Sequence, residues 1–401
     1  MNGPRRAASA HATQRRATGI RVTLSALGLA LAASSAALGA VSLRVARTVV
    51  RPAGRVPDTR IVGVDAAAQT ITLSRTPDTV LPGRYGLFTV GSVDYVRLGS
   101  IVGSDDETVT RKLLTHVPAD SDLAAEAAFS GWYFDRPEQV HRPFRAIEIA
   151  TGVGACPAWE FPAADDTDVW VIQVHGRGTT KAETLRAVPV FHDLGVTSLV
   201  VSYRNDGEAP KSPSGTYALG ATEWRDVDAA IGYARRRGAR RVILMGWSMG
   251  GALALQAALE SPHGDVIAGL VLESPVVDWR TVLRFHGHLM RLPAPVIAVA
   301  QNALGSAWGA AVLGSGEAIP LDRLDAVSRA QELGHPILLL HSDDDGFVPS
   351  DASHALAAAR PDLVTMETFE VARHTKLWNY DETRWVGAIS EWMRARGLAA
   401  D

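Results

Sequence analysis

The feature that most constrains the fold is the run Gly246-Trp247-Ser248-Met249-Gly250, which has the form G-x-S-x-G. An apolar run at 241–245 precedes it and is typical of a buried strand, and a run of helix formers follows at 252–259. A serine on a tight turn from strand to helix has strained backbone geometry, so its neighbours must be small. The turn leaves the hydroxyl at a helix N-terminus, where free N–H groups stabilise negative charge. The pattern predicts a nucleophilic serine, Ser248; an incidental serine in a glycine-rich turn is the alternative.

Length and composition limit the classes of protein to consider. At 401 residues the chain is longer than one ordinary domain and is expected to form two folded units and a tail. Apolar residues make up 47% of the chain, which allows a large core. The formal charge of -3 gives no electrostatic reason to expect a nucleic-acid partner. The single cysteine, Cys156, excludes a disulfide within the chain and a cysteine-based metal site.

Residues 1–57 are expected to be a basic N-terminus, a membrane or signal segment and a linker. Five arginines and no acid occur in residues 1–21, and residues 22–43 carry no charge. Such an uncharged stretch is long enough to span a bilayer as a helix. We expect an uncleaved transmembrane anchor at 22–43 that leaves the folded part outside the cytoplasm. The alternative is secretion after signal cleavage, because Ser35-Ala36-Ala37 offers a small-residue cleavage site.

Residues 58–123 are expected to form a small antiparallel β module. Short β-prone runs are separated by Gly, Asp and Pro at hairpin distances; they lie at 61–64, 70–73, 85–90, 95–98 and 108–114. The segment contains no His, Asp and Glu cluster with the spacing of metal ligands. Its role is therefore predicted to be structural or substrate-gating.

From residue 143 to 401 the chain alternates strands and helices. After a hairpin at 145–149 and 157–161, strands are expected at 169–174, 198–202, 242–245, 270–273, 337–340 and 364–369. Helices are expected near 181–194, 223–237, 249–259, 352–359 and 382–396. This alternation predicts an α/β fold with a mostly parallel sheet and helices on both faces.

Residues 279–329 interrupt the alternation, and residues 292–316 carry no charge. A second membrane span is excluded, because the strands before and after this insert must join one sheet on one side of a membrane. We expect a helical lid over the serine, with apolar residues such as Trp308 facing inward. Lids above apolar pockets suit acyl or lipid-like substrates. A lid packed for stability alone is the alternative.

A serine hydroxyl needs a base to take its proton and an acid to orient that base. When the serine sits on this kind of turn, the acid and then the base follow later in the chain, past strand ends. Asp345 lies in the loop after the strand at 337–340, and His374 lies in the loop after the last strand. We therefore predict that Ser248, Asp345 and His374 are nucleophile, acid and base.

Other acids near this position are assigned different roles. Asp343 and Asp344 are expected to cap the turn or face solvent, because three adjacent carboxylates are costly to bury together. Glu273, past an earlier strand, is the second candidate for the acid.

Stabilisation of a tetrahedral intermediate requires two N–H donors. We predict the backbone N–H groups of Met249 and Arg177. Arg177 lies in the His175-Gly176-Arg177-Gly178 loop after the strand at 169–174, where glycines let the backbone approach a substrate. His175 is expected to hydrogen-bond beneath this loop. No H-E-x-x-H motif or comparable His pair supports a metal site.

With G-W-S-M-G, H-G-R-G, the Asp345 loop and Ala-Arg-His374 taken together, residues 143–401 resemble the α/β-hydrolase superfamily. Within it they resemble the dienelactone-hydrolase and acylaminoacyl-peptidase-like serine hydrolases, and they are similar to membrane-anchored actinobacterial α/β-hydrolases with an N-terminal extension. The resemblance implies a triad at Ser248, His374 and Asp345, with no metal or organic cofactor. Two positions depart from the family pattern: Ser342 and Ala372 stand where glycines are usual, which affects loop geometry.

The expected activity is that of a serine hydrolase that cleaves an ester, thioester or amide through an acyl-enzyme. A carboxylic ester with a small-molecule or lipid-like acyl group is the expected substrate. The alternatives are acyl transfer by the same triad and a non-catalytic binding module on the same fold. Fold analogy alone does not settle the substrate.

Overall fold

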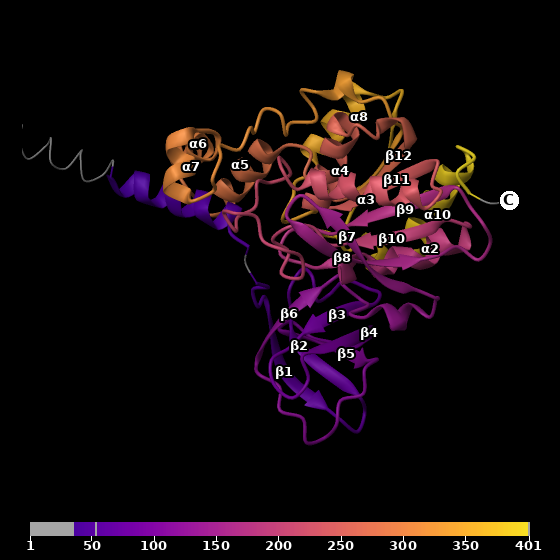
Figure 1. Ribbon diagram of the computed structural model, residues 1–401. Helices are drawn as coiled ribbons and strands as arrows, with labels where there is room; N and C mark the ends of the chain where they lie inside the picture. The colour runs from indigo at the N-terminus through magenta and orange to yellow at the C-terminus, as the bar shows by residue number, and fades with distance from the viewer. Residues whose placement is uncertain (1–35, 53, 400–401) are drawn as a thin grey trace, which may run out of the picture.

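Two folded units make up the protein, a small β-barrel and a larger α/β unit that lies above it in Figure 1. The computed structural model describes residues 36–52 and 54–399. The predicted α/β-hydrolase fold class, with a separate β module ahead of it, is confirmed.

The larger unit is built on an eight-stranded sheet in the order β14-β13-β12-β11-β9-β10-β8-β7. Its parallel strands are β9 (Val169–Val174), β10 (Thr197–Val201), β11 (Arg241–Trp247), β12 (Ile267–Glu273), β13 (Ile337–Ser342) and β14 (Val364–Phe369). At one edge, β8 (Gly154–Phe161) and β7 (Arg145–Thr151) are antiparallel. The central strands are apolar runs buried on both faces, as a parallel sheet covered by helices requires.

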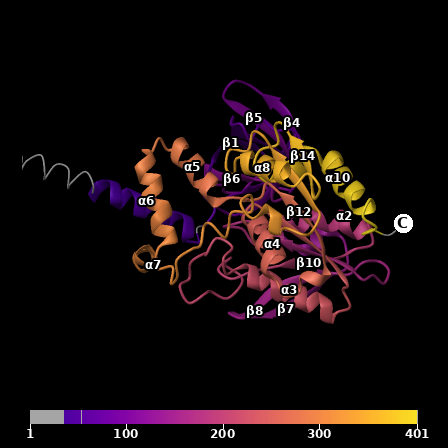
Figure 2. The same ribbon diagram turned by 90° about the horizontal axis from the view of Figure 1, so that it is seen from above.

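Helices cover both faces of this sheet (Figure 2). On one face lie α3 (Trp224–Arg236), α4 (Met249–Glu260) and α8 (Asp351–Ala359), and on the other lie α2 (Val188–Asp193) and α10 (Glu382–Arg394). Each face of the sheet has its own hydrophobic core, and side chains alternate between the two faces along a strand. In β9, Ile172 packs against the helices of the first face and Val171 against those of the second. Shorter helices are η1 (Pro137–Val140), η2 (Lys181–Ala187), η3 (Gly264–Val266), η4 (Ala330–Glu332) and α9 (Leu377–Tyr380).

The insert is helical and consists of α5 (Trp279–Leu289), α6 (Ala294–Gly305) and α7 (Ala307–Leu313). The expected inward orientation of Trp308 is wrong, since its side chain is 49% exposed. The buried stripe of α7 is Gly309, Ala310 and Leu313, and residue 308 falls outside that stripe. The insert instead reaches the cavity beside Ser248 through α5, whose Trp279, Val282, Leu283 and His286 line it.

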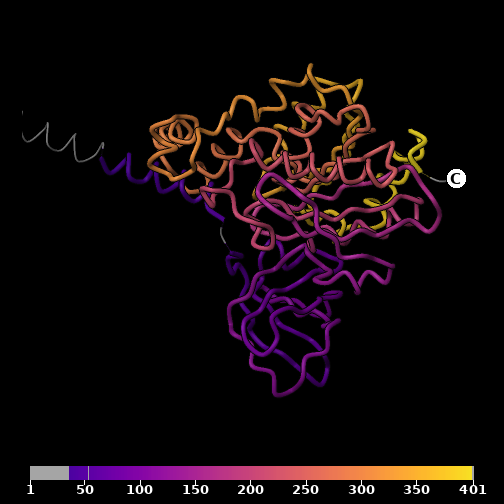
Figure 3. Tube along the Cα trace, viewed as in Figure 1, coloured from indigo at the N-terminus to yellow at the C-terminus, as the bar shows by residue number. Residues whose placement is uncertain are grey.

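A helix over residues 36–50 lies beside α5, α6 and α7 (Figures 1 and 3). Residues 44–50, predicted to be linker, are therefore helical. The buried positions Ser42, Ala46 and Val50 recur every four residues, so one face of this helix packs into the main core. Arg47 also donates a hydrogen bond to the carbonyl of Val312 in α7, 2.9 Å away. The arginines between these positions made the segment resemble a polar linker, so the helical spacing of its apolar residues was not recognised from the sequence.

The predicted membrane or signal segment at 22–43 lies largely outside the described residues. Among the helices that are described, none is by itself long and apolar enough to cross a membrane. Taken together, α6 and α7 have the length and apolar composition of a membrane-spanning segment, but the chain bends by 92° between them.

The β module is a closed barrel in the order β1-β2-β5-β4-β3-β6. Its strands are β1 (Thr59–Asp65), β2 (Thr70–Ser74), β3 (Tyr85–Phe88), β4 (Tyr95–Ser104), β5 (Thr108–Leu113) and β6 (Glu126–Ser130). β6 lies beyond residue 123, the predicted end of the module. Its Glu-Ala-Ala-Phe-Ser sequence has weak β propensity, and antiparallel pairing with β1 and β3 holds it as a strand.

The packing of α4 against β9 gives a prediction about stability. A Cβ atom on Gly250 would lie 2.1 Å from the carbonyl oxygen of Val174, so Gly250→Ala must push α4 off the sheet. We expect this variant to lower the free energy of unfolding by about 1–3 kcal/mol, measured by urea denaturation. Gly387→Ala is the matched control, because this helical glycine in α10 has open space around it and alanine favours helix. Equal stability of the two variants would contradict the prediction.

Candidate active site

Ser248 occupies the turn between β11 and α4 with φ 50° and ψ −117°, a region that residues with side chains rarely adopt. Two glycines make this turn possible. A Cβ on Gly246 would lie 2.4 Å from the carbonyl oxygen of Gly250, and Gly250 itself abuts β9. Hydrogen bonds hold the serine backbone on both sides: its N–H donates to the Glu273 carbonyl at 3.1 Å, and its carbonyl accepts from the Val276 N–H at 3.0 Å.

The structure brings the three predicted side chains into one chain of hydrogen bonds. His374 Nε2 lies 3.1 Å from Ser248 Oγ, and His374 Nδ1 lies 2.7 Å from Asp345 Oδ2. When Nδ1–H donates to the carboxylate, Nε2 carries a free lone pair that faces the serine hydroxyl. The arrangement can therefore remove the proton of Ser248.

The Asp345 side chain is buried and surrounded by donors. Its Oδ1 accepts hydrogen bonds from the N–H groups of Phe347 and Val348, both at 2.8 Å. Its Oδ2 contacts His374 and also His341 Nε2, which lies 3.3 Å away. Burial alone would raise the pKa of Asp345, but the two histidines and the hydrogen bonds hold this pKa well below its usual range.

His341 is a supporting residue that the sequence analysis missed. Its ring is fully buried between Asp345, the Val348 carbonyl at 3.0 Å and the Ser353 hydroxyl at 2.8 Å. The sequence feature that could have identified it is a histidine directly after the apolar residues 337–340 of β13.

The other two carboxylates of this loop differ in role. Asp343 is half exposed and accepts hydrogen bonds from Ser350 and His354, as expected of a turn residue. Asp344 instead joins the loop that carries Asp345 to the loop that carries His374. Its Oδ1 accepts hydrogen bonds from the Ser342 hydroxyl at 2.7 Å and from the Arg373 N–H at 2.9 Å.

The two departures from the family pattern contact each other. The Ala372 N–H donates to Ser342 Oγ at 2.8 Å. Ser342 therefore adds a hydrogen bond between the acid and histidine loops that a glycine at this position lacks.

Glu273, the second candidate for the acid, does not contact His374. Its carboxylate is fully buried beneath the site and accepts hydrogen bonds from the indole N–H groups of Trp247 at 2.9 Å and Trp385 at 2.8 Å. Arg186 lies 3.6 Å away, and burial raises the pKa of Glu273. This group supports the turn from below and is not positioned to orient the base.

The loop at 175–178 passes directly beside the serine, because a Cβ on Gly176 would lie 3.3 Å from Ser248 Cβ. The Gly176 N–H is occupied by Glu183 Oε2 at 3.0 Å. The N–H groups of Arg177 and Met249, the two predicted donors, make no hydrogen bond to other described residues. They remain available to an oxygen bound next to Ser248.

His175 lies beneath this loop, as expected. Its Nε2 is 3.1 Å from Asp206 Oδ2, and its ring stacks on Tyr203 with the ring centroids 4.3 Å apart. The Arg177 side chain reaches in the other direction and donates to the carbonyls of Thr48 and Arg51, at the end of the helix over 36–50. The N-terminal helix is thereby tied to the loop beside the serine.

Ser248 lies where two cavities meet. One has a volume of about 440 Å³ and mostly apolar walls, which include Val41, Val45 and Val49 of the helix over 36–50 and Trp279, Val282 and Leu283 of α5. The other, of about 240 Å³, is more polar and includes Arg55, Asp58, Ser130, Thr375 and Lys376. The position of the barrel beside Ser248 agrees with the substrate-gating alternative for the β module, whereas the N-terminal helix was not expected at the site.

Within residues 36–52 and 54–399, no group of three or more His, Cys, Asp or Glu side chains is arranged to hold a metal ion.

The environment of Asp345 gives a prediction about pH. Because its folded pKa lies below the unfolded value of about 3.9, its contribution to stability is present at neutral pH and is lost as the pH falls through the folded pKa. Asp345→Asn should lower the free energy of unfolding at pH 7 by about 1–3 kcal/mol. The difference from the wild type should narrow below about pH 4. Urea denaturation across this range measures this difference in the free energy of unfolding, with Asp106→Asn, at an exposed position between β4 and β5, as control. A difference independent of pH would refute the prediction.

Comparison with known families accounts for both units. A family model described as the alpha/beta hydrolase family matches residues 171–388, and one described as a domain of unknown function (DUF8805) matches residues 60–130, which form most of the barrel. No curated protein matches the chain.

The chain is similar to several solved structures. The Pyrococcus furiosus esterase Pf2001 is 15% identical, with 65% of this chain and 95% of that chain covered and a TM-score of 0.51. A second crystal form of the same esterase gives 16% identity, coverage of 65% and 94%, and a TM-score of 0.50. A puromycin-hydrolyzing peptidase of Mycobacterium tuberculosis is 19% identical, with 82% of this chain and 44% of that chain covered and a TM-score of 0.47. Since the hydrolase model spans more than half of the sequence, this chain belongs to the α/β hydrolase family.

Proposed function

We propose that the protein is a serine hydrolase that cleaves carboxylic esters through an acyl-enzyme. The observation that carries this proposal is the continuous path from Ser248 Oγ through His374 to Asp345, with contacts of 3.1 and 2.7 Å. A binding module on the same fold has no need of this alignment. The solved esterases that share the fold agree with the proposal but, at their low identity, do not carry it.

In this mechanism His374 Nε2 takes the proton of Ser248 while Oγ attacks the acyl carbonyl carbon. The carbonyl oxygen becomes negatively charged and is stabilised by the N–H groups of Met249 and Arg177. Collapse of the intermediate breaks the bond to the leaving oxygen, which receives the proton from His374. Water then repeats the sequence on the acyl-enzyme and releases the acid. Asp345 keeps the proton of the imidazole on Nδ1 throughout.

The apolar cavity favours an acyl group over a peptide. Its walls offer valine, leucine and tryptophan side chains and few hydrogen-bonding groups. A peptide would bury unpaired N–H and C=O groups there, which is costly, whereas an acyl chain would not. Esters with a hydrocarbon acyl group are therefore the proposed substrates.

We also propose that the protein is anchored in a membrane by residues 22–43, with its folded part outside the cytoplasm. The uncharged stretch supports this, as do apolar side chains exposed on neighbouring surfaces: Leu38, Val41, Leu289, Met290, Val299, Trp308 and Val312.

Labelling with a fluorescent fluorophosphonate tests the nucleophile. The wild type should be labelled and should hydrolyse p-nitrophenyl esters, while Ser248→Ala should lose labelling and at least about a thousandfold in kcat/KM. The acyl length that gives the highest kcat/KM then measures the length of chain that the apolar cavity accommodates. Ser315→Ala, a serine of the lid, is the control. Full activity in folded Ser248→Ala protein would exclude the proposed mechanism.

Cell fractionation tests the anchor. The full chain should stay with membranes after a carbonate wash, and external protease should digest its folded part in intact cells. Leu27→Arg together with Leu31→Arg should release it, because each arginine costs about 2.5–3.5 kcal/mol at the centre of a membrane helix. Ser248→Ala should remain bound. Protection of the folded part until the cells are lysed would contradict the proposed orientation.

A further inference from the structure

The two cavities at Ser248 differ in which catalytic group they reach. Ser248, Arg177 and Phe347 line both, whereas His374 lines the polar cavity and not the apolar one. Under the proposed function, His374 delivers a proton to the leaving oxygen. The leaving group must therefore depart on the side of the polar cavity, and the acyl chain occupies the apolar one.

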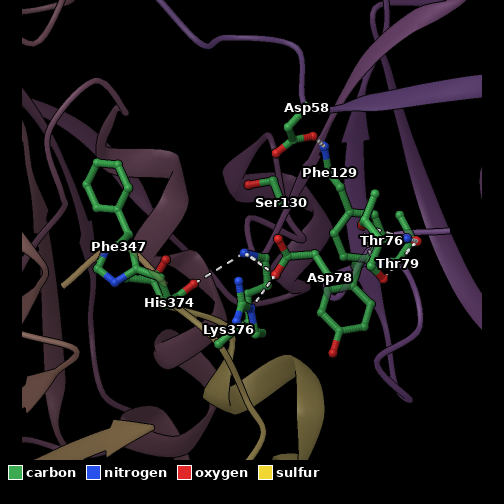
Figure 4. A network of polar contacts seen from close by, with 12 residues as sticks. Asp58, Thr76, Asp78, Thr79, Phe129, Ser130, Phe347, His374 and Lys376 are labelled. Atoms are coloured by element: carbon green, nitrogen blue, oxygen red, sulfur yellow. Dashed lines mark hydrogen bonds and ion pairs between the residues drawn. The ribbon is translucent and has the colours of Figure 1, made fainter. Parts of the chain in front are cut away.

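The barrel forms one wall of the polar cavity. Phe129 and Ser130 at the end of β6 line it, together with Arg55 and Asp58 just ahead of β1. Figure 4 shows Asp58, Phe129 and Ser130 on the barrel side, across from Phe347 and His374. A substrate in this cavity therefore touches both folded units.

The barrel is docked against the histidine loop itself. Asp78 lies 3.4 Å from Lys376 Nζ (Figure 4). It also lies 3.4 Å from Arg373 Nε, and Arg373 and Lys376 flank His374 in the sequence. A Cβ on Gly83 would lie 1.9 Å from the carbonyl oxygen of Asn379, so the two backbones are in close contact. The wall of the cavity is thus held at a fixed position relative to the base.

Arg55 is the charged group of this wall that lacks a counterion. Its guanidinium lies 3.7 Å from the Phe88 ring centroid and 5.0 Å from that of Trp132, and its Nη1 donates to Ser130 Oγ at 2.9 Å. No carboxylate of the described residues lies within 4.0 Å of it. Burial lowers the pKa of Arg55, although the more distant Glu183 and Asp58 oppose this.

The other charged groups of the cavity have close partners. Lys376 is paired with Asp78. The Arg177 guanidinium, which belongs to the α/β unit, also has no carboxylate within 4.0 Å among the described residues, but its Nη2 donates to the backbone carbonyls of Thr48 and Arg51. Glu183 accepts from the Gly176 N–H and from the Thr179 hydroxyl at 2.8 Å. Asp58 accepts from the Phe129 N–H at 2.8 Å and from the Thr59 hydroxyl at 2.9 Å. A desolvated guanidinium without a counterion is stabilised by an anionic ligand.

We propose that the barrel makes the leaving-group site and that Arg55 binds an anionic oxygen there. This inference rests on the proposed function and specifies its substrate: an ester with an apolar acyl chain and a leaving alcohol that bears a carboxylate or a phosphate-like group. Two negative oxygens match the planar fork of a guanidinium. Arg55 is then a specificity-determining residue supplied by the barrel.

Three chromogenic butanoyl esters test the proposal. They are 4-butanoyloxy-3-nitrobenzoate, the matching phenylphosphonate, and the neutral 4-butanoyloxy-3-nitrobenzamide. Each releases a coloured nitrophenolate, and kcat/KM is divided by the rate constant for attack by hydroxide, which removes differences in intrinsic reactivity. The full-length wild type should favour at least one anionic ester over the benzamide by about tenfold or more. The two anionic arms distinguish a carboxylate from a phosphate-like group.

Variants assign any preference to Arg55. Arg55→Gln should bring the ratio of kcat/KM for the anionic esters to kcat/KM for the benzamide down to about one, whereas Arg55→Lys should keep part of the preference. Arg60→Gln, which removes an exposed arginine of β1 outside the cavity, should leave kcat/KM for the anionic esters and for the benzamide unchanged. Equal rates for all three esters in the wild type, or a preference that survives Arg55→Gln, would overturn this inference while the proposed function stands. Absence of both hydrolysis and fluorophosphonate labelling would instead refute the proposed function.

Discussion

The strained backbone at Ser248 is the constraint on which the rest of the site depends. A φ of 50° at a residue with a side chain costs about 1–3 kcal/mol, so the surrounding structure must hold the turn from several directions. The glycines on either side allow α4 to pack directly on β9, and the hydrogen bonds to Glu273 and Val276 fix the serine peptide groups. The hydroxyl is thereby presented in one orientation before any substrate binds.

The contacts that hold the turn at Ser248 also extend to the loop that carries His374. The Glu273 backbone binds the Ser248 N–H, while the Glu273 side chain accepts hydrogen bonds from Trp247 and Trp385. Arg186 lies beside it and donates to the carbonyl of Thr375, next to His374. Ser248 and His374 are therefore both held by one buried polar cluster. A buried carboxylate is expensive unless it is paired and hydrogen-bonded, and here its donors come from the elements that must be aligned.

The sequence predicted those parts of the site that local pattern determines. Ser248 and Asp345 each follow a strand of mostly apolar residues, and His374 follows the last, more polar strand; parallel strands end at the same edge of a sheet. Where the outcome depends on contacts distant in the sequence, prediction failed. Asp344 was expected at a turn or in solvent, yet it joins two loops, because only the folded chain brings Arg373 to it. Trp308 was expected to face inward, since composition does not reveal which stripe of a short apolar helix is buried.

The N-terminal helix shows how a single local error hid part of the site. Residues 44–50 were assigned to a linker because of their arginines, although Ala46 and Val50 are fully buried and Val45 and Val49 line the apolar cavity. Arg177 donates hydrogen bonds to carbonyls at the end of this helix, so the loop at 175–178 and the helix hold each other in position. The core positions Ser42, Ala46 and Val50 and the cavity-lining Val41, Val45 and Val49 all follow the small-residue run at 35–37. Cleavage there and retention of an anchor would therefore leave the same cavity wall, which means that the geometry at Ser248 is compatible with either fate of the N-terminus.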